Sequence, residues 1–394
     1  MGINKKIMRK FALSSISAAL VISAALCTAE RMKGTDMTDP LKMIAAETTL
    51  PSGNFQYYDS TYNAPSPEPS ETEQSAKQKQ ESSRASESSV ESETTAESKT
   101  EADIPKATSG KEFESSEATA EEIEAYDNEH EGEEQYPVLE FTSVLGNMAY
   151  DGVQVKNSSS ADIDIKSELE GRLGFKMEKT SEPQVLIYHT HTCESFLTYD
   201  TGYYYESFYP RTTDKSKSVC AVGEEIAKQL NAFGIATLHD TTYHDSPSYS
   251  GAYYRSTDTV NEYLEKYPSI KVVLDIHRDG IGTDIQRSKP VCYVNGKKAA
   301  QMMILAGYNC DNDPAFKDWE YNLRFALQIQ NTAQKMYPDL VRPLNFGDFV
   351  YNMDINTGSL LIEIGADSNT LEEVRYTGYL LGNVLSEVLS AKKD

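Results

Sequence analysis

The chain has 394 residues and a formal charge of −24, which is unevenly distributed. Residues 66–135 contain 21 acidic and 6 basic residues, a local charge of −15, whereas residues 183–394 contain 27 and 19, a charge of −8. Without a basic excess beyond the first ten residues, the chain is not expected to bind nucleic acid. Because it has only one long apolar stretch, it is not a protein with several membrane spans.

The N-terminal residues 1–29 have the pattern of an export segment. Lys5, Lys6, Arg9 and Lys10 precede an apolar run over residues 11–27, and polar sequence follows. The run is slightly short for a hydrocarbon core of about 30 Å, so it is either a cleaved signal or a single-span anchor. We favour the anchor because a long flexible segment follows it. Either reading places the rest of the chain outside the cytoplasm, tethered to the membrane or secreted.

Residues 30–135 are predicted to form a disordered tether. They are rich in Ser, Glu, Thr and Ala and contain few large apolar side chains, so burial cannot compensate for the entropy of ordering them. A flexible coil of about seventy residues spans roughly 45–50 Å, and charge repulsion extends it further. Such a tether would let a membrane-held enzyme reach into a wall layer.

The sequence becomes more apolar after residue 135. Residues 136–182 are predicted to be a lead-in subdomain that packs on the main domain, with a short helix over residues 163–173. Residues 183–394 show the alternation of apolar strands and amphipathic helices that is typical of a globular domain.

The expected elements of this domain follow one another as strands and helices. Strands are predicted over residues 185–188, 235–238, 271–276 and 360–364, helices over 219–233, 256–267, 319–337 and 371–389, and a hairpin over 290–306 with Asn295-Gly296 as its turn. This order predicts an α/β fold with a mostly parallel mixed sheet flanked by helices on both faces. In such sheets functional residues lie beyond the carboxyl ends of the strands.

Histidines and carboxylates gather at these strand ends. His191 and Glu194 follow the first strand with the spacing H-x-x-E, and His277 ends a second strand. Together they offer two imidazoles and a carboxylate and leave a fourth position for water, as catalytic zinc requires. Zinc lowers the pKa of a bound water to about 7, which makes it a usable nucleophile. The sequence therefore predicts a catalytic zinc site.

Further polar residues surround this set. His189 shares the strand end with His191, so either could bind the metal while the other orients it or contacts substrate. Glu363 lies in an apolar strand, where a carboxylate is costly, and is the predicted general base and acid. Its alternative role is a buried ion pair with Arg278 or Arg375.

Several motifs in order resemble the stage II sporulation protein P family. They are the Tyr-His-Thr-His-Thr-Cys-Glu-Ser-Phe of residues 188–196, the His-Asp and Ser-Tyr-Ser-Gly-Ala-Tyr of 244–253, the Asp-Ile-His-Arg-Asp-Gly of 275–280, and the Leu-Ile-Glu-Ile-Gly of 361–365 followed by Asn-Thr-Leu-Glu-Glu. Members of this family are membrane-anchored cell-wall hydrolases of endospore-forming bacteria, similar to zinc N-acetylmuramoyl-L-alanine amidases. The resemblance covers residues 183–394.

The resemblance implies an activity, a setting and a partner. It implies cleavage of the amide between N-acetylmuramic acid and L-alanine of peptidoglycan, with a further endopeptidase activity on stem-peptide cross-links. It also implies wall thinning during forespore engulfment, together with membrane engulfment partners and the lytic transglycosylase called stage II sporulation protein D.

By the same resemblance, the zinc ligands fall on His191 or His189, on Glu194 and on His277, and the catalytic carboxylate falls on Glu363. Related amidases take their middle Glu ligand from just before the first helix, where this chain has no Glu. Glu194 is the best substitute by spacing, and Glu206 and Glu224 are the alternatives.

Two other functions fit the same residues. A zinc carboxypeptidase also uses H-x-x-E with a distant His and a late Glu, and it needs an Arg for the terminal carboxylate, which Arg278 could supply. We therefore count Arg278 with Glu363 as a catalytic candidate. A wall-binding scaffold without activity is the third interpretation. In each case the loop of residues 244–255, rich in Tyr and Ser, could hold a glycan–peptide strand.

Overall fold

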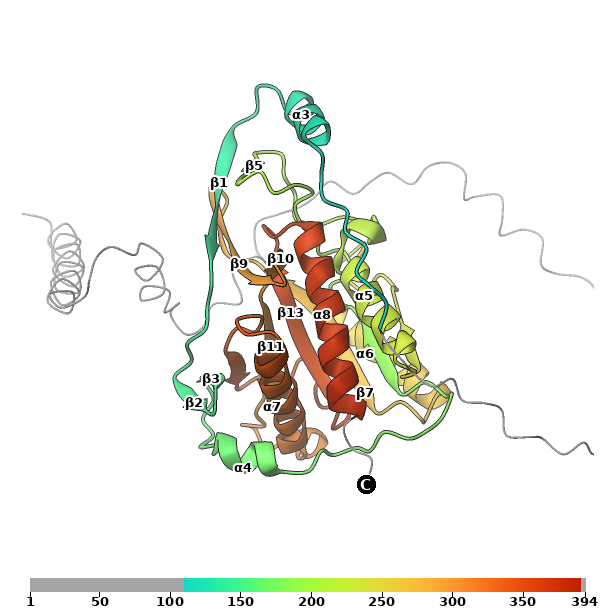
Figure 1. The fold of residues 1–394 in the computed structure, drawn as a ribbon. Helices are drawn as coiled ribbons and strands as arrows, with labels where there is room; N and C mark the ends of the chain where they lie inside the picture. The colour runs from blue at the N-terminus through green and yellow to red at the C-terminus, as the bar shows by residue number, and fades with distance from the viewer. Residues whose placement is uncertain (1–109, 391–394) are drawn as a thin grey trace, which may run out of the picture. The chain divides into compact units, whose positions relative to one another are not determined.

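The computed structural model describes residues 110–390 (Figure 1). The predicted export segment over residues 1–29, and the tether up to residue 109, lie outside the described residues. Among residues 110–390, no helix is long and apolar enough to cross a membrane.

An eight-stranded mixed sheet forms the centre of the domain. Its order is β2 (Met148–Tyr150), β3 (Val153–Asn157), β12 (Leu344–Gly347), β11 (Met302–Gly307), β13 (Ser359–Ala366), β7 (Val272–Asp279), β4 (Val185–Tyr188) and β6 (Thr237–His239). Neighbouring strands run parallel except at the β2–β3 and β11–β13 pairs. This confirms the predicted mostly parallel sheet.

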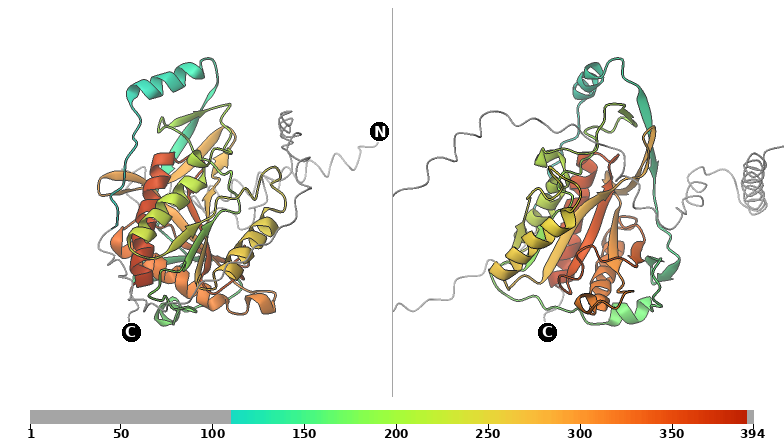
Figure 2. Two further views of the ribbon diagram at one scale, coloured as in Figure 1. Left: turned by 90° about the vertical axis from the view of Figure 1, so that its right-hand side faces the viewer. Right: turned by 180° about the vertical axis from the view of Figure 1, so that it is seen from behind.

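Helices cover both faces of this sheet (Figures 1 and 2). One core joins α5 (Val219–Ala232), α7 (Trp319–Met336) and α8 (Leu371–Ser390) to alternate strand residues such as Ile187, and a second core joins α6 (Ala252–Lys266) to Leu186 and its neighbours. Because successive side chains of a strand point to opposite faces, the two cores lie on opposite sides. The predicted α/β class with helices on both faces is therefore confirmed.

A second sheet stands beside the first. Its order is β10 (Lys297–Ala300), β9 (Gln286–Val294), β1 (Gln135–Phe141) and β5 (Tyr203–Tyr205), and β8 (Gly282–Thr283) pairs with β9. The predicted hairpin forms as β9 and β10, and its turn residues Asn295 and Gly296 have the positive φ angles of 51° and 78° that this turn requires. Its predicted second strand is too long, because the chain leaves this sheet after Ala300 and continues as β11 of the first sheet.

The predicted lead-in, residues 136–182, contributes strands to both sheets. Strand β1 lies between β9 and β5, β3 pairs with β12, and the short helix α4 (Ile165–Glu170) contacts α7. Residues 136–182 therefore complete the two sheets and do not stand apart as a layer of their own.

The predicted extent of the tether, residues 30–135, is corrected at its C-terminal end. Helix α3 (Ala120–Glu129) begins with a capping box between Thr119 and Glu122. Before it, Phe113 packs against Tyr376 and Tyr379 of α8, with ring centroids 5.0 and 5.7 Å apart. Composition did not indicate this segment because its contacts are made by scattered aromatic and polar side chains, such as Phe113 with Tyr376 and Asp127 with Tyr205.

Candidate active site

The three predicted ligands of the H-x-x-E and His277 set lie together at the carboxyl ends of β4 and β7. The rings of His191 and His277 are 5.3 Å apart between centroids and nearly perpendicular, at 86°. Glu194 Oε2 lies 3.7 Å from His277 Nδ1 and accepts a hydrogen bond from the Arg278 backbone N–H. All three ligand side chains are buried, so the fold brings together the set that spacing predicted.

Asp275 lies next to this cluster, between His277 and Thr190. Its Oδ1 lies 2.9 Å from His277 Nε2, outside the angular range of a hydrogen bond, and its two oxygens accept hydrogen bonds from the N–H and hydroxyl of Thr190. Burial opposes the protonation of His277, but the carboxylates of Asp275 and Glu194 outweigh it and raise the pKa of His277 to about 10. The carboxylates of the site therefore stabilise a positive charge at the position of His277.

The donor set fits a zinc ion. Nδ1 of His191 is buried without a hydrogen-bond partner, which is costly unless a ligand completes it. Burial lowers the pKa of His191 well below its usual value, so the imidazole stays in the neutral form that binds metals. Two imidazoles and one carboxylate are the ligands of a catalytic zinc centre.

Glu363 lies on the next strand at the same level. In the parallel β13–β7 pair its register partner is His277. Its Oε2 is inaccessible to solvent and has no hydrogen-bond partner, and burial together with Asp279 raises the pKa of Glu363 well above its usual value. A carboxyl group with a raised pKa is suited to accept and return a proton, as a general base and acid must.

The alternative role of Glu363, a buried ion pair, does not form. Arg375 Nη2 donates to Glu225, and the three guanidinium nitrogens of Arg278 donate to backbone carbonyls. Two of these carbonyls, those of Ser195 and Pro210, belong to the segments around the ligand turn. Arg278 thus stabilises the turn that carries His191 and Glu194. Each of its guanidinium nitrogens is hydrogen-bonded within the protein.

Two tyrosines pack on His191 and His277. Tyr249 stacks on His191 with centroids 4.3 Å apart and planes at 6°, and Tyr253 lies nearly parallel to His277, at 6.4 Å and 15°. Tyr351 also stacks with Tyr253, with centroids 5.5 Å apart. The two stacks fix the planes of both imidazoles, so the predicted loop of residues 244–255 does border the site.

Asp245 ties this loop to the ligand turn. Its buried carboxylate accepts hydrogen bonds from the Cys193 backbone N–H and from Nη2 of Arg211, and it lies 3.9 Å from His191 Nδ1. Arg211 in turn forms a backbone bridge with Glu194. One carboxylate therefore holds both segments that position the ligands.

His189 has a separate set of contacts. Its Nδ1–H donates to the carbonyl of Ile276, and its Nε2 lies 2.9 Å from Nε2 of His239. Burial, followed by the neighbouring His239, lowers the pKa of His189 to about 3, so it stays neutral. With both nitrogens engaged, His189 is not brought together with the ligand cluster.

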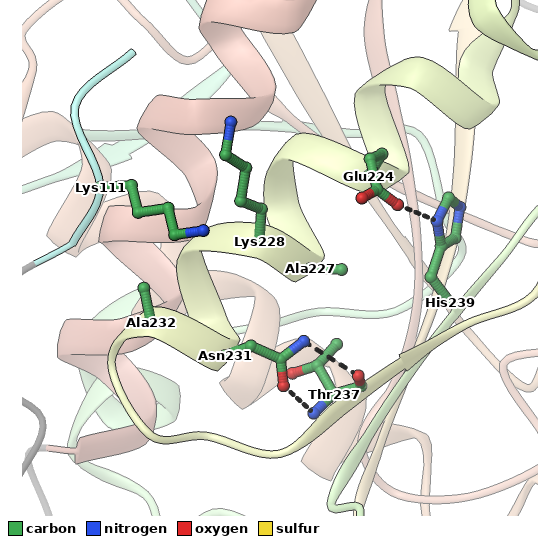
Figure 3. A pocket seen from close by; sticks show the side chains of 8 residues that line it. All are labelled: Lys111, Glu224, Ala227, Lys228, Asn231, Ala232, Thr237 and His239. Atoms are coloured by element: carbon green, nitrogen blue, oxygen red, sulfur yellow. Dashed lines mark hydrogen bonds and ion pairs between the residues drawn. The ribbon is translucent and has the colours of Figure 1, made fainter. Parts of the chain in front are cut away.

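The alternative middle ligands also lie elsewhere. Glu224 Oε2 is 3.4 Å from Nδ1 of His239, and both residues line a pocket of about 490 Å³ between Lys111, α5 and β6 (Figure 3). Glu206 is exposed beside β5, where its backbone N–H donates to Glu134. Glu194 is the candidate that the structure brings to the histidines.

A group of three carboxylates lies outside this site. Glu140, Asp200 and Glu373 lie close enough to share an ion, but the Nζ of Lys289 is within 3.4 Å of all three and Lys298 pairs with two of them. The two lysines pair with these carboxylates, so the cluster is an ion network that is exposed at Glu140 and Asp200 and buried at Glu373.

Several site residues were missed by sequence reasoning. Nothing in their local pattern marks Arg211 or Tyr351, because both lie in irregular segments far along the chain from the ligands they approach. Asp245 belongs to the His-Asp motif of the predicted loop, but nothing in the sequence marked it as a partner of Cys193 and Arg211.

Comparison with known proteins gives one family. The family model described as stage II sporulation protein P matches residues 39–386. The stage II sporulation protein P of Bacillus subtilis (strain 168) is 27% identical over 215 residues, which are 52% of this chain and 50% of that protein. The chain thus matches about half the length of that relative.

Solved structures of amidases show weak similarity. The N-acetylmuramoyl-L-alanine amidase AmiC2 of Nostoc punctiforme is 13% identical with a TM-score of 0.32, covering 54% of this chain and 98% of that one. The CwlD amidase of Clostridioides difficile, solved with the GerS lipoprotein, is 13% identical with a TM-score of 0.30, covering 53% and 100%. At this level neither structure identifies an activity for the chain.

Proposed function

Because the chain belongs to the stage II sporulation protein P family, we propose that it is a zinc-dependent cell-wall hydrolase. Its substrate is peptidoglycan, and the bond cleaved is the amide between N-acetylmuramic acid and L-alanine. One observation carries this proposal: buried His191, Glu194 and His277 meet at the end of one sheet, with Glu363 at the same level on the next strand.

Each residue has a separate role in this reaction. His191, Glu194 and His277 would hold the ion, which when bound polarises the amide carbonyl and lowers the pKa of the attacking water to about 7. The Glu363 carboxylate accepts a proton from that water and returns it to the leaving nitrogen of L-alanine. Asp275 orients His277, and the Tyr249 and Tyr253 rings keep both imidazoles from turning.

A metal-replacement experiment tests the proposal. A chelator should abolish the release of peptides from purified glycan strands, and added zinc should restore it. His277→Ala should remove this activity, because it deletes a ligand, whereas Lys266→Ala on the outer surface of α6 should leave it unchanged. Undiminished activity of His277→Ala would refute the metal assignment.

The setting and the partners belong to the same proposal. The catalytic domain works outside the cytoplasm, held at the membrane by residues 1–29, during forespore engulfment and next to the lytic transglycosylase stage II sporulation protein D. A protease added to intact cells should digest the C-terminal domain, and the transglycosylase should co-purify with the full chain. Protection from the protease would contradict this location.

A further inference from the structure

Arg211 offers hydrogen-bond donors beside the metal ligands. Its Nη2 donates to Oδ2 and to the backbone carbonyl of Asp245, at 2.7 and 3.3 Å. Within residues 110–390, Nε and Nη1 of Arg211 have no hydrogen-bond partner, and 22% of the side chain is exposed. One side of the guanidinium is therefore anchored, while the remaining donors face the solvent.

The position of this guanidinium is fixed relative to the site. It lies 5.1 Å from the ring centroid of Tyr249, and the same ring stacks on His191. Tyr249 thus contacts both Arg211 and His191, and Asp245 lies within 4 Å of both as well. An anion bound to Arg211 would therefore lie close to the proposed reacting centre.

In the neighbouring arginines every guanidinium nitrogen takes part in a hydrogen bond within the protein. All three guanidinium nitrogens of Arg278 donate to backbone carbonyls, and those of Arg255 do the same toward the carbonyls of His244, Ser248 and Ser250. The role of binding a carboxylate, which the sequence suggested for Arg278, therefore suits Arg211.

We propose that Arg211 binds a carboxylate of the peptide part of the substrate and so selects stem peptides that carry a free acid near the cleaved bond. This inference rests on the proposed amidase function. A guanidinium presents a planar set of N–H donors that matches a carboxylate, and Asp245 already holds it in place, so little further ordering is needed on binding. In a stem peptide whose second residue is a γ-linked glutamate, its α-carboxylate is the first free acid after the cleaved amide.

Two substrates that differ in one group test this assignment. Both are muropeptides with the same glycan and peptide, one with the α-carboxylate of the second residue free and the other with it amidated. A charge-assisted hydrogen bond should favour the free acid by about tenfold to a hundredfold in kcat/KM for the natural chain. Arg211→Gln should remove this preference, whatever its effect on the overall rate.

Arg255→Gln provides the matched control. It removes one positive charge from the loop that Arg211 contacts through Asp245, but from a guanidinium whose three nitrogens all donate to backbone carbonyls, so the preference should persist. Equal rates on both substrates with the natural chain, or an unchanged preference in Arg211→Gln, would overturn the role of Arg211.

Binding of the cleaved peptides separates this inference from the proposed reaction. By calorimetry, the free-acid peptide should bind the zinc-loaded chain more tightly than the amidated one, and Arg211→Gln should abolish the difference. Cleavage of neither substrate would defeat the proposed activity, while the binding comparison would still decide whether Arg211 holds a carboxylate. Equal binding of both peptides would overturn the inference even if both substrates were cleaved.

Discussion

Among residues 110–390, Oε2 of the Glu363 carboxylate has no hydrogen-bond partner. This oxygen is inaccessible to solvent, while His277 lies beside Glu363 in the strand register. A buried carboxylate without a hydrogen bond costs stability, and proteins keep such groups where a reaction needs a proton acceptor with a raised pKa. The stability cost of this carboxylate can be measured by replacing it with a neutral amide.

Replacing Glu363 by Gln should stabilise the metal-free protein in a pH-dependent way. Burial raises the pKa of Glu363 above its unfolded value, so the carboxyl favours folding at low pH and loses this contribution as pH rises through its folded pKa. Glu363→Gln should therefore match the natural chain in thermal midpoint near pH 4 and exceed it by a few degrees at pH 8. A lower midpoint at pH 8 would show that the carboxylate is stabilised by contacts.

The identity of the middle ligand is open to a paired substitution. Glu194→Gln should weaken zinc binding at least about a hundredfold, because losing a ligand costs more than losing an outer partner. Glu206→Gln removes an exposed carboxylate beside β5 and should leave zinc binding unchanged. Zinc dissociation constants from competition with a chelating dye would measure both. Equal zinc dissociation constants for the two variants would show that Glu194 is not a ligand.

Sequence reasoning at the residue scale succeeded where chemistry was local. His191, Glu194 and His277 follow apolar strands whose ends coincide in any parallel sheet, so their convergence was predictable. The use of Arg278 was not, because its acceptors are backbone carbonyls of Ser195 and Pro210, which no residue pattern encodes.

Among the elements, the segment before α3 is the largest departure from the predicted tether. Phe113 contacts Tyr376 and Tyr379, and Ser115 and Ser116 donate hydrogen bonds to Glu372 of α8. These contacts join residues more than 250 positions apart in the chain. The segment is therefore expected to add to the stability of the domain.

Phe113→Ala tests this contribution. Losing a half-buried aromatic ring should lower the free energy of unfolding by about 1–3 kcal/mol, somewhat less than for a fully buried Phe. The adjacent exposed residue provides the control, and Glu112→Ala should change it by less than about 0.5 kcal/mol. Urea unfolding of both variants gives the comparison. If Phe113→Ala unfolds at the same urea concentration as the natural chain, the packing against α8 contributes nothing.

Long periodic elements were predicted well and short ones poorly. The strands β4 and β7 and the helices α5, α7 and α8 lie within a few residues of their predicted bounds. Helix α6 begins at Ala252 and not near residue 256, because Gly251 at φ 80° starts it while the hydroxyls of Ser256 and Thr257 bond to the Tyr253 carbonyl. These hydroxyls resemble caps in sequence but lie inside the helix.

At the scale of the whole molecule, much of the −24 charge lies on one folded segment. Residues 110–135, which contain α3, have 11 acidic residues and one basic residue, whereas residues 1–109 have 15 and 12. The rest of the domain holds many of its charges in pairs such as Lys289 with Glu373 and Arg342 with Asp279. A positively charged metal at the strand ends and Arg211 beside it would then face the anionic substrate, while most acidic groups lie elsewhere.

The products of wall digestion test the central claim most directly. The zinc-loaded chain of residues 110–394 is incubated with purified peptidoglycan, and the soluble products are identified by mass spectrometry. We predict intact stem peptides with free L-alanine amino termini, together with glycan strands that have lost them. Single C-terminal amino acids would identify a carboxypeptidase, no soluble product would identify a binding scaffold, and either result would contradict the account.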